Sequence, residues 1–405
     1  MKAHLIKFAD EAELARAIEG IGCNMESQPF FEAKREMLQI YLREVPSPAA
    51  SIIKQELLAR GGDAATHARV ITCGVDKSDV ILFGTAKQLG YLAEKLKKMP
   101  WWGLEGCAEE IIALTAPRRP RAAALPCGAE LVFGERTLLM GIINLTDDSF
   151  FVGSRSFGDG EKALAAALRM ADEGADILDL GAESTRPGSE RTPEKQELER
   201  MTAAVKAIRR ELPRMPLSID TTRSAVARAA LDEGADIIND ISGLRFDEDI
   251  AAAAAEYRAM LALTHMRGTT ADMMERCKYD NLLSEICEFL KEAAEKARSY
   301  GVAEESIIID PGIGFAKNQA QNLELLRHCE SFKSLGYPLL VGASRKGVVG
   351  WATGRERAEE RLYGTLAVTA ACCRQRADII RVHDVRANKE VLMMTEAIWR
   401  ADYAG

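Results

Sequence analysis

Polar or ionisable side chains come directly after a series of short apolar runs in this chain. In chain order they are Asn144, Glu183, Asp220, Asn239 with Asp240, His265, Asp310, Ser344 with Arg345 and Lys346, and Arg381 with His383. An Asp or Asn after an apolar run is often only a turn former or a helix cap. Capping would not favour Lys, Arg and His, so the whole series is better explained by one shared site.

The types of these residues indicate the ligand. Asp220, Asn239 and Asp310 offer acceptors and an amide, which suit a flat heterocycle with several N–H donors, because a buried carboxylate needs a donor partner. Arg381 and His383 are two residues apart, so on a strand both point the same way and could grip an anion such as a phosphate ester.

Two further side chains complete the inventory. Lys346 adds a positive charge on a mobile stem. Asn144 is a neutral oxygen ligand, the type that Mg²⁺ accepts when phosphate oxygens and waters fill most of its coordination shell. The residues together therefore predict a donor-rich heterocycle, a diphosphate and Mg²⁺.

The elements that must position these residues alternate between short apolar runs and amphipathic helices. The runs predict strands at Leu138–Asn144, Asp176–Gly181, Leu217–Asp220, Asp236–Asp240, Met260–Thr264, Ser306–Asp310, Pro338–Ala343 and Asp378–His383. Apolar residues at steps of three and four form one helix face before the third strand and another before the sixth. These faces are Leu198, Met201, Val205 and Ile208, and Leu283, Ile286, Leu290 and Ala294.

An internal repeat supports this unit structure. The sequence DEGADILDL at Asp172 recurs as DEGADIIND at Asp232, and RADIIRVH at Arg376 is a weaker third copy. In each long copy a helix ends, Gly174 or Gly234 can supply the positive φ of a helix C-cap, and a buried strand follows. The offset corresponds to two βα units of about thirty residues each.

The predicted fold is a (β/α)₈ TIM barrel. Eight strands and eight helices in roughly 275 residues match a closed parallel barrel, which typically needs about 250. A doubly wound open sheet is the alternative, although it more usually carries fewer strands. In a barrel the active site lies at the carboxyl ends of the strands, which is where the polar side chains fall.

A smaller α/β domain precedes the barrel. Residues 116–127 are rich in proline and arginine without an apolar period, so they predict a linker between a first domain at 1–115 and the barrel at 128–405. In the first domain the pattern predicts helices at Glu11–Glu19, Glu32–Arg43 and Ala86–Lys98. It predicts strands at Arg69–Thr72 and Val80–Phe83. No cluster of chemically active residues assigns it a role; assembly or packing against the barrel is the hypothesis.

Composition narrows the class of protein. The formal net charge of -8 argues against a nucleic-acid-binding surface, and no apolar run reaches the length of a membrane span. The nine cysteines form no CxxC pair, which favours buried small hydrophobes in a reducing compartment over a disulfide framework. A cytoplasmic enzyme of small molecules, with no nucleic-acid or membrane partner, is therefore expected.

From about Leu125 to Ala401 the chain resembles dihydropteroate synthases. The resemblance is carried by separate segments in barrel order: MGIINLTDDSF, GAESTRPG, SIDT, IIND, THMRG, DPGIGF, GASRKG and RVHDV. It implies a folate-pathway transferase, the target of sulfonamides, that joins 4-aminobenzoate to 7,8-dihydropterin hydroxymethyl diphosphate with Mg²⁺. The products are 7,8-dihydropteroate and pyrophosphate.

The resemblance also implies a role for each matching residue. The diphosphate is held by Asn144, which is the Mg²⁺ ligand, with Arg381 and His383. The pterin pocket comprises Asp220, Asn239, Met266, Asp310, Phe315 and Lys346. The aminobenzoate side comprises Phe150, Thr185, Arg186, Pro187 and Ser344. Catalysis falls on Asp220, Lys346, Arg381 and His383, and the enzyme is expected to be a homodimer.

The first loop departs from the family pattern, and two other functions compete. The family usually has proline where this chain has Asp147, and a Ser-Asp-Gly-Gly-like run in place of Phe151–Ser154. A pterin-dependent methyltransferase would have no use for the anion grip of Arg381 and His383. A pterin-binding protein without turnover is the alternative from another class, and pyrophosphate release would distinguish it from a synthase.

Overall fold

The computed structural model describes residues 3–4, 6–8, 11–24, 26, 28–116, 120–145, 159–183 and 192–399. The chain divides into two compact units, Met1–Arg118 with Ala397–Gly405, and Arg119–Glu396. Each unit has a hydrophobic core of its own. None of the helices that the structure describes is long and apolar enough to cross a membrane.

The first unit contains a three-stranded antiparallel sheet with helices. The strands are β1 (Leu38–Pro46), β2 (Asp63–Thr66) and β3 (Lys77–Gly84), in the order β1-β3-β2. The helices are α1 (Glu11–Gly20), α2 (Gln28–Glu32), α3 (Ser47–Leu58), α4 (Ala86–Leu96) and α5 (Leu104–Thr115). Alternate residues of β3 are buried, so one face of the sheet packs on the core that α3, α4 and α5 share.

Two elements predicted for this unit are wrong. The second half of the predicted helix Glu32–Arg43 belongs to strand β1, because pairing with β3 buries Ile40 and Leu42 on one face. The predicted strand Arg69–Thr72 is a turn instead, closed by hydrogen bonds from the N–H of Val70 and of Cys73. Strand pairing therefore overrode the helical pattern at β1, whereas local hydrogen bonds formed the turn at Arg69–Thr72.

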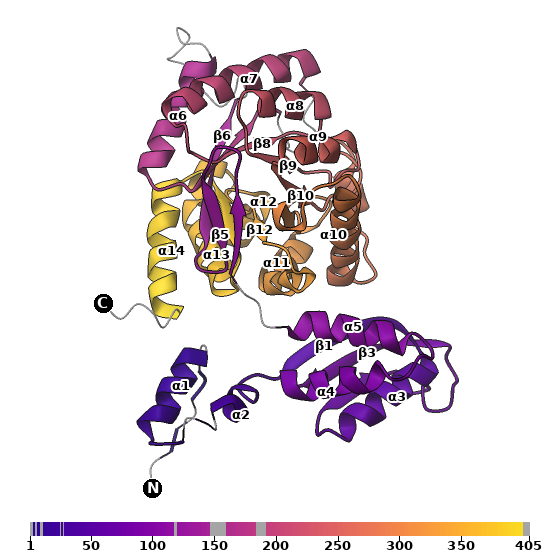
Figure 1. Ribbon diagram of the computed structural model, residues 1–405. Helices are drawn as coiled ribbons and strands as arrows, with labels where there is room; N and C mark the ends of the chain where they lie inside the picture. Colours follow the sequence, from indigo (N-terminus) through magenta and orange to yellow (C-terminus); the bar gives the residue numbers. More distant parts are fainter. Residues whose placement is uncertain are drawn as a thin grey trace. The chain divides into compact units, whose positions relative to one another are not determined.

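The second unit is a closed parallel barrel of eight strands (Figure 1). They are β6 (Leu138–Asn144), β7 (Ile177–Gly181), β8 (Leu217–Asp220), β9 (Ile237–Asp240), β10 (Met260–Thr264), β11 (Ile307–Asp310), β12 (Leu340–Val341) and β13 (Ile379–Val382). The sheet order is β11-β10-β9-β8-β7-β6-β13-β12, and a bridge between Ile309 and Leu339 closes the ring. All eight predicted strands are confirmed, and so is the TIM barrel.

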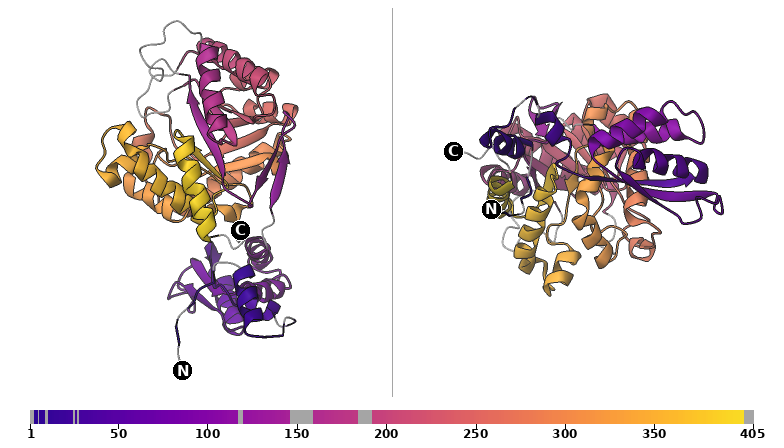
Figure 2. Two further views of the ribbon diagram at one scale, coloured as in Figure 1. Left: turned by 90° about the vertical axis from the view of Figure 1, so that its left-hand side faces the viewer. Right: turned by 90° about the horizontal axis from the view of Figure 1, so that it is seen from below.

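Helices cover the outside of the strands (Figures 1 and 2). They are α6 (Asp159–Asp172), α7 (Glu194–Glu211), α8 (Ser224–Asp232), α9 (Asp249–Tyr257), α10 (Leu282–Ser299), α11 (Gln319–Arg327), α12 (Gly347–Thr353), α13 (Leu362–Arg374) and α14 (Val385–Trp399). The two predicted helix faces belong to α7 and α10, and most of their residues are buried against the strands. Short 3₁₀ helices lie at Met273–Arg276, Glu304–Ser306, Cys329–Leu335 and Ala358–Arg361.

The internal repeat has a common structural role at the amino ends of the strands. Gly174 and Gly234 have φ of 92° and 98°, as predicted, and Arg376 takes the same left-handed conformation in the third copy, with φ of 59°. The aspartate two residues later accepts the N–H of the neighbouring strand in all three copies, at 2.8 to 2.9 Å. These aspartates are Asp176, Asp236 and Asp378.

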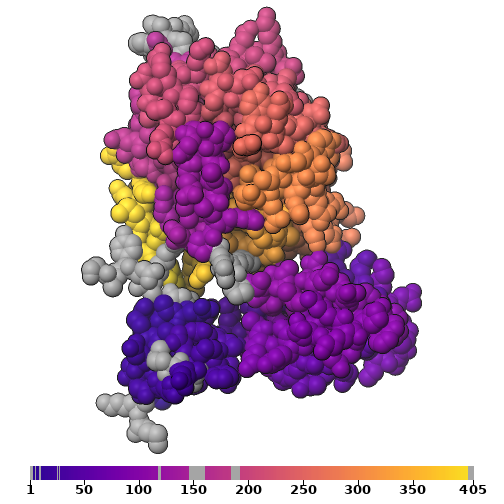
Figure 3. Space-filling view, viewed as in Figure 1, coloured from indigo at the N-terminus to yellow at the C-terminus, as the bar shows by residue number. Residues whose placement is uncertain are grey.

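A β-hairpin covers the amino-terminal end of the barrel. Strand β4 (Arg121–Ala124) pairs antiparallel with β5 (Glu130–Phe133), so the second half of the segment predicted as a linker belongs to this unit. Its apolar side chains, Ala123, Leu125, Leu131 and Phe133, pack against the inward-facing apolar layer of the strands. In Figure 3 the hairpin, in purple, lies over the barrel between its magenta and orange parts. The half of the barrel interior at the amino ends of the strands is therefore filled with apolar side chains.

Candidate active site

The upper layer of the barrel is polar on four consecutive strands. Asp220 of β8, Asn239 of β9, Thr264 of β10 and Asp310 of β11 stand at or near the carboxyl ends of their strands, and all four are buried. Asn239 Oδ1 and Thr264 Oγ1 are buried without a hydrogen-bond partner among the described residues. Buried polar atoms normally find a partner, so this part of the lumen is prepared for a ligand with polar edges.

The guanidinium of Arg381 bridges two carboxylates inside the lumen. Its Nε donates to Asp179 Oδ2 and its Nη2 to Asp220 Oδ2, each at 2.6 Å. Asp179 also accepts from Ser218 Oγ at 2.6 Å and from Asn239 Nδ2 at 3.4 Å. Nη1 of Arg381 has no hydrogen-bond partner within the described part of the chain, so it is the guanidinium nitrogen that can reach a ligand.

Burial changes the protonation of the acidic members of this site. It raises the pKa of Asp220 to about 7, although the adjacent Arg381 opposes the shift. Burial also raises the pKa of Asp310, against the charge of Lys346 and the hydrogen bond from Gly312 N–H. A ligand that donates N–H groups to these carboxylates would favour their charged forms.

Lys346 follows β12 and lies beside the aromatic ring of Phe315. Its Nζ donates to the carbonyl oxygen of Ile313 at 2.6 Å and stands 4.6 Å from the centre of that ring. Burial lowers the pKa of Lys346 to about 8, so its charge is retained only in part above that pH. Phe315 and Met266 share a small apolar cluster, which gives the polar ring a flat apolar neighbour.

Two side-chain pairs join the loops after β12 and β13. Ser344 Oγ lies 3.0 Å from His383 Nδ1 and accepts the backbone N–H of His383 at 3.2 Å. Arg345 donates to both carboxylate oxygens of Asp384, at 3.0 and 2.6 Å. The Ser344 hydroxyl accepts from the backbone, and when its proton goes to Nδ1 the ring proton is on Nε2. Burial lowers the pKa of His383 to about 4, so the ring is neutral at pH 7.

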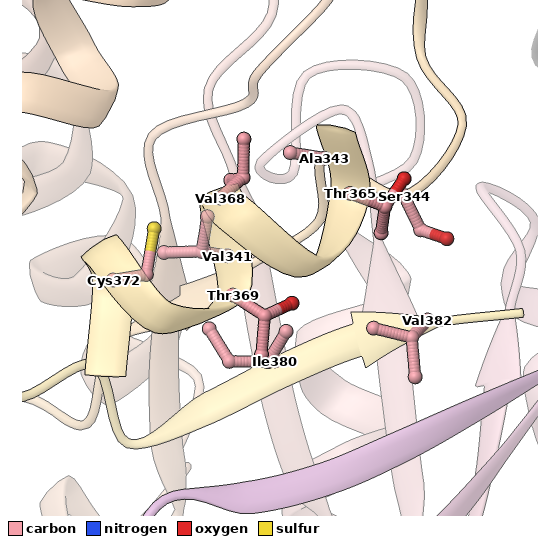
Figure 4. A pocket seen from close by; sticks show the side chains of 9 residues that line it. All are labelled: Val341, Ala343, Ser344, Thr365, Val368, Thr369, Cys372, Ile380 and Val382. Atoms are coloured by element: carbon pink, nitrogen blue, oxygen red, sulfur yellow. The ribbon is translucent and has the colours of Figure 1, made fainter. Parts of the chain in front are cut away.

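A cavity lies behind Ser344, between β12, β13 and α13 (Figure 4). Ser344 and Thr365 lie at one end of it and Cys372 at the other. Its walls include Val341 and Ile380, which point away from the lumen into the helix layer. Ser344 is the one predicted substrate-binding residue among those that line the cavity, and Asp220, Asn239, Asp310, Lys346 and Arg381 do not line it.

The predicted metal ligand Asn144 is exposed at the carboxyl end of β6. No group of three or more His, Cys, Asp or Glu side chains in the described ranges is arranged to hold a metal ion. A single neutral oxygen fits a metal whose other ligands are phosphate oxygens and water. The predicted aminobenzoate residues Phe150, Thr185, Arg186 and Pro187 lie outside the described residues.

A buried ion pair fixes the chain just after residues 184–191. Glu197 of α7 is fully buried, pairs with Arg223 and accepts the Thr221 hydroxyl at 2.6 Å. Arg223 also donates to the carbonyl oxygen of Thr192 at 2.8 Å, and the Thr192 hydroxyl donates to Ala182 at 3.2 Å. These contacts tie β7, α7 and the segment after β8 together at the rim of the site.

The sequence therefore predicted most of the polar ring but missed one buried charge in the lumen, Asp179, and two beside it, Lys317 and Glu197. Asp179 sits inside an apolar run, Lys317 follows the DPGIGF segment, and Glu197 lies on a helix. A charged residue at a strand position that should face the lumen was the available signal for Asp179. The lumen thus brings together Asp179, Asp220, Asn239, Asp310, Phe315, Lys346, Arg381 and, beside them, Ser344 with His383.

Fold and site define an enzyme of the pterin-binding barrel class, since a donor-rich flat ring suits the unpaired acceptors and the carboxylates. The sequence pattern of the pterin binding enzyme family matches residues 140–383. A dihydropteroate synthase from Synechocystis is 46% identical over 280 residues, which is 68% of this chain and 95% of the relative.

Two further proteins extend the comparison. A bifunctional dihydropteroate synthase/dihydropteroate reductase from Helicobacter pylori is 32% identical over 400 residues, 98% of this chain and 100% of the relative. The structure of Xanthomonas albilineans dihydropteroate synthase with 4-aminobenzoic acid has a TM-score of 0.65 and 37% identity, covering 70% of this chain and 100% of that one. The chain belongs to the pterin-binding enzyme family, and its activity is that of a dihydropteroate synthase, a transferase of the folate pathway.

Proposed function

We propose that the polar ring binds the pterin of 7,8-dihydropterin hydroxymethyl diphosphate and that the loops above it present 4-aminobenzoate. One observation carries the assignment of the pterin to this layer: Asn239 Oδ1 is buried without a hydrogen-bond partner among the described residues, on a strand that lies between those of the buried Asp220 and Asp310 in the barrel order. An aminopterin edge supplies N–H donors for these acceptors and lone pairs for the Asn239 amide and for Lys346. Phe315 and Met266 then flank the ring faces.

The diphosphate is proposed to lie at the end of β13. Nη1 of Arg381 and Nε2–H of His383 are the donors that the lumen leaves for its oxygens. Asn144 would supply a neutral oxygen ligand to Mg²⁺ there, and Mg²⁺ when bound would neutralise charge that develops on the leaving group. Because Arg381 is already paired with two carboxylates, it orients the diphosphate through a hydrogen bond more than it contributes net positive charge.

In the proposed reaction the bond between the exocyclic methylene carbon and the diphosphate oxygen breaks, and its electron pair leaves on pyrophosphate. The cation that remains on the pterin is stabilised by the ionised carboxylate of Asp220. The lone pair of the aminobenzoate nitrogen then forms the new carbon–nitrogen bond, and one proton of that nitrogen passes to a pyrophosphate oxygen. Attack by an arylamine needs orientation more than a strong base.

The aminobenzoate side is proposed to include Phe150, Thr185, Arg186, Pro187 and Ser344. Of these, the structure describes only Ser344, whose hydroxyl is engaged with His383. Ser344 therefore contributes to this side while it also orients the imidazole. The ion pair of Glu197 and Arg223 supports the segment at Thr192, next to the loop that carries three of the five residues.

Pyrophosphate release tests the proposal. The protein is incubated with the pterin diphosphate, 4-aminobenzoate and Mg²⁺, and each component is omitted in turn. Release that needs all three, and that falls in Asn239→Ala but not in Asn318→Ala, a helix cap on α11, supports the assigned ring. Release without the arylamine would indicate a hydrolase, and pterin binding without release would indicate a binding protein.

A second activity is proposed for the whole chain, reduction of its own product. The relative from Helicobacter pylori that spans both units is named for dihydropteroate reductase as well as the synthase. Such a step adds two electrons and two protons to dihydropteroate, with a reduced flavin or nicotinamide as the donor. Oxidation of either donor that requires dihydropteroate would support it, and no oxidation under conditions where the Helicobacter protein is active would contradict it.

We also propose a cytoplasmic homodimer. Its substrates are small charged metabolites, and Trp351 of α12 and Tyr363 of α13 expose 61% and 83% of their surface, which favours a contact between copies. Light scattering on the purified protein measures the mass directly. A mass of one chain, 44.3 kDa, at micromolar concentration would contradict the dimer.

A further inference from the structure

Among the residues that the structure describes, Lys317 is the largest fully buried polar side chain. It follows Phe315 by two residues, has 1% exposed surface, and none of the roles assigned above uses it. A buried lysine is rare unless its charge is paired or fully hydrogen-bonded. Its surroundings therefore indicate what the charge does.

The ammonium group of Lys317 is matched by three acceptors. Its Nζ lies 3.0 Å from the carbonyl oxygen of Gly312, 2.9 Å from that of Phe315 and 2.9 Å from His265 Nδ1. A fourth acceptor, the carbonyl oxygen of His265, is farther away at 3.4 Å. An ammonium has three N–H donors, one for each of these acceptors. Burial lowers the pKa of Lys317 well below its usual value, and the negative charge of Asp310 opposes this shift. The cage of three acceptors, together with Asp310, favours the charged form. Burial also lowers the pKa of His265 to about 2, so its ring is neutral, and Nδ1 accepts from Lys317 when the ring proton is on Nε2.

The backbone around this ammonium is the segment that carries the pterin-side contacts. Gly312 has φ of 73°, and a Cβ there would lie 2.0 Å from the His265 carbonyl oxygen, so the turn after Asp310 packs directly on the loop after β10. Ile313, inside the cage, supplies the carbonyl that receives Lys346, and Phe315 lies beneath the same Nζ. The cage thus fixes the partners of Lys346.

The same ammonium also balances charge. The charged groups that face Asp310 are Lys346 from the loop after β12, Arg381 from β13 and Lys317 from its own loop, and each holds down the pKa that burial raises. The neighbour of Asp310 just after β10 is His265, which is neutral and donates its backbone N–H to the carbonyl oxygen of Asp310 at 3.0 Å. Removal of the Lys317 charge would therefore leave Asp310 with a higher pKa.

We infer that Lys317 is a positioning residue of the pterin pocket, whose buried ammonium holds the Gly312–Phe315 loop and the charge of Asp310 ready for the pterin. This rests on the proposed function, because the loop matters only if the pterin binds beside it. It acts through Asp310, Phe315 and Lys346 and does not itself touch the substrate.

The test compares two buried lysines. Lys317→Met keeps the length of the side chain and removes its charge. Lys333→Met is the matched control, because Lys333 is also largely buried and pairs with Asp378 at 2.6 Å, at the amino-terminal end of the strands. We expect Lys317→Met to weaken pterin binding about 10- to 100-fold, the range typical of residues that orient binding groups from behind. The Kd of Lys333→Met for the pterin should stay within about twofold of that of the unsubstituted protein, although both variants are expected to be less stable.

The pH dependence separates positioning from stability. As the pH is lowered, Lys317→Met should lose pterin binding, measured by calorimetry, at a higher pH than the unsubstituted protein does. The reason is that Asp310 then accepts a proton more readily. A pterin Kd and acid limb equal to those of the unsubstituted protein would overturn the inference. Absence of pterin binding in the unsubstituted protein would instead contradict the proposed function.

A second variant covers the case in which Lys317→Met does not fold. Lys317→Gln keeps two N–H donors for the cage and removes the charge, and the same binding measurements and the same acid-side shift are expected. Failure of both variants to fold would assign Lys317 to stability alone and would overturn the inference.

Discussion

Replacement of Asp179 by asparagine tests the charge arrangement of the lumen most directly. The carboxylate receives Arg381 at 2.6 Å and Ser218 at 2.6 Å, and it is fully buried. An asparagine keeps one acceptor oxygen, but its amide turns N–H donors toward those of Arg381 or Asn239. Removal of one partner of a buried ion pair typically costs about 3–5 kcal/mol. Because Arg381 still pairs with Asp220, we expect the free energy of unfolding, measured with urea, to fall by about 3 kcal/mol, the lower end of this range.

The same substitution should also move a titration. The negative charge of Asp179 raises the pKa of Asp220, after burial, while Arg381 lowers it. Without that charge the pKa of Asp220 falls below about 7, so the pterin should remain bound to a lower pH. Displacement of Arg381 by about 1 Å should reduce kcat/KM for the pterin about 100-fold.

Asp240→Asn is the control for this experiment. Asp240 is equally buried but faces the helix layer, where it accepts the N–H groups of Ser242 and Leu244 at 2.8 and 2.6 Å. Loss of a charged acceptor there should cost about 1.5–3 kcal/mol and leave the acid limb of pterin binding in place. If Asp179→Asn has an unchanged free energy of unfolding and loses pterin binding at the same acidic pH as the unsubstituted protein, the proposed charge arrangement of the lumen is refuted.

Three further outcomes are expected. Because Asp220 is charged above about pH 7 and Lys346 below about pH 8, kcat/KM for the pterin should peak between these values; a flat profile between about pH 6 and 9 would contradict the pairing. Asn144→Ala should raise the Mg²⁺ concentration for half-maximal rate about 10-fold or more, with pterin affinity in the absence of metal unchanged; an unchanged requirement would exclude Asn144 as a ligand. Arg223→Lys should raise KM for 4-aminobenzoate several-fold and spare pterin binding, whereas Arg228→Lys, in an exposed pair with Glu256, should change neither.

The barrel was predictable because its strands have an unusually simple sequence. Most of them are short, largely buried apolar runs, and the repeat at Asp172 and Asp232 fixed the spacing of the units. The first unit offered no such regularity. The run from Leu38 to Pro46 mixes apolar and charged residues in a way that fits either a helix or a strand, and only its pairing with β3 decides.

Most of the site followed from the position of polar residues after the strands. The contacts between these residues could not be predicted from the sequence, because such contacts depend on distances across the lumen. Arg381 was predicted to grip an anion, and the structure shows that two of its nitrogens are first engaged by Asp179 and Asp220. The cage around Lys317 joins segments 52 residues apart, so no local pattern announces it.

The hairpin of β4 and β5 has a consequence for the order of events in the catalytic cycle. It closes one end of the barrel with apolar side chains, so the lumen has a single entrance, at the carboxyl ends of the strands. Whatever binds deepest must arrive first and depart last. We therefore expect an ordered sequence in which the pterin diphosphate precedes the arylamine, and the condensed product leaves after pyrophosphate.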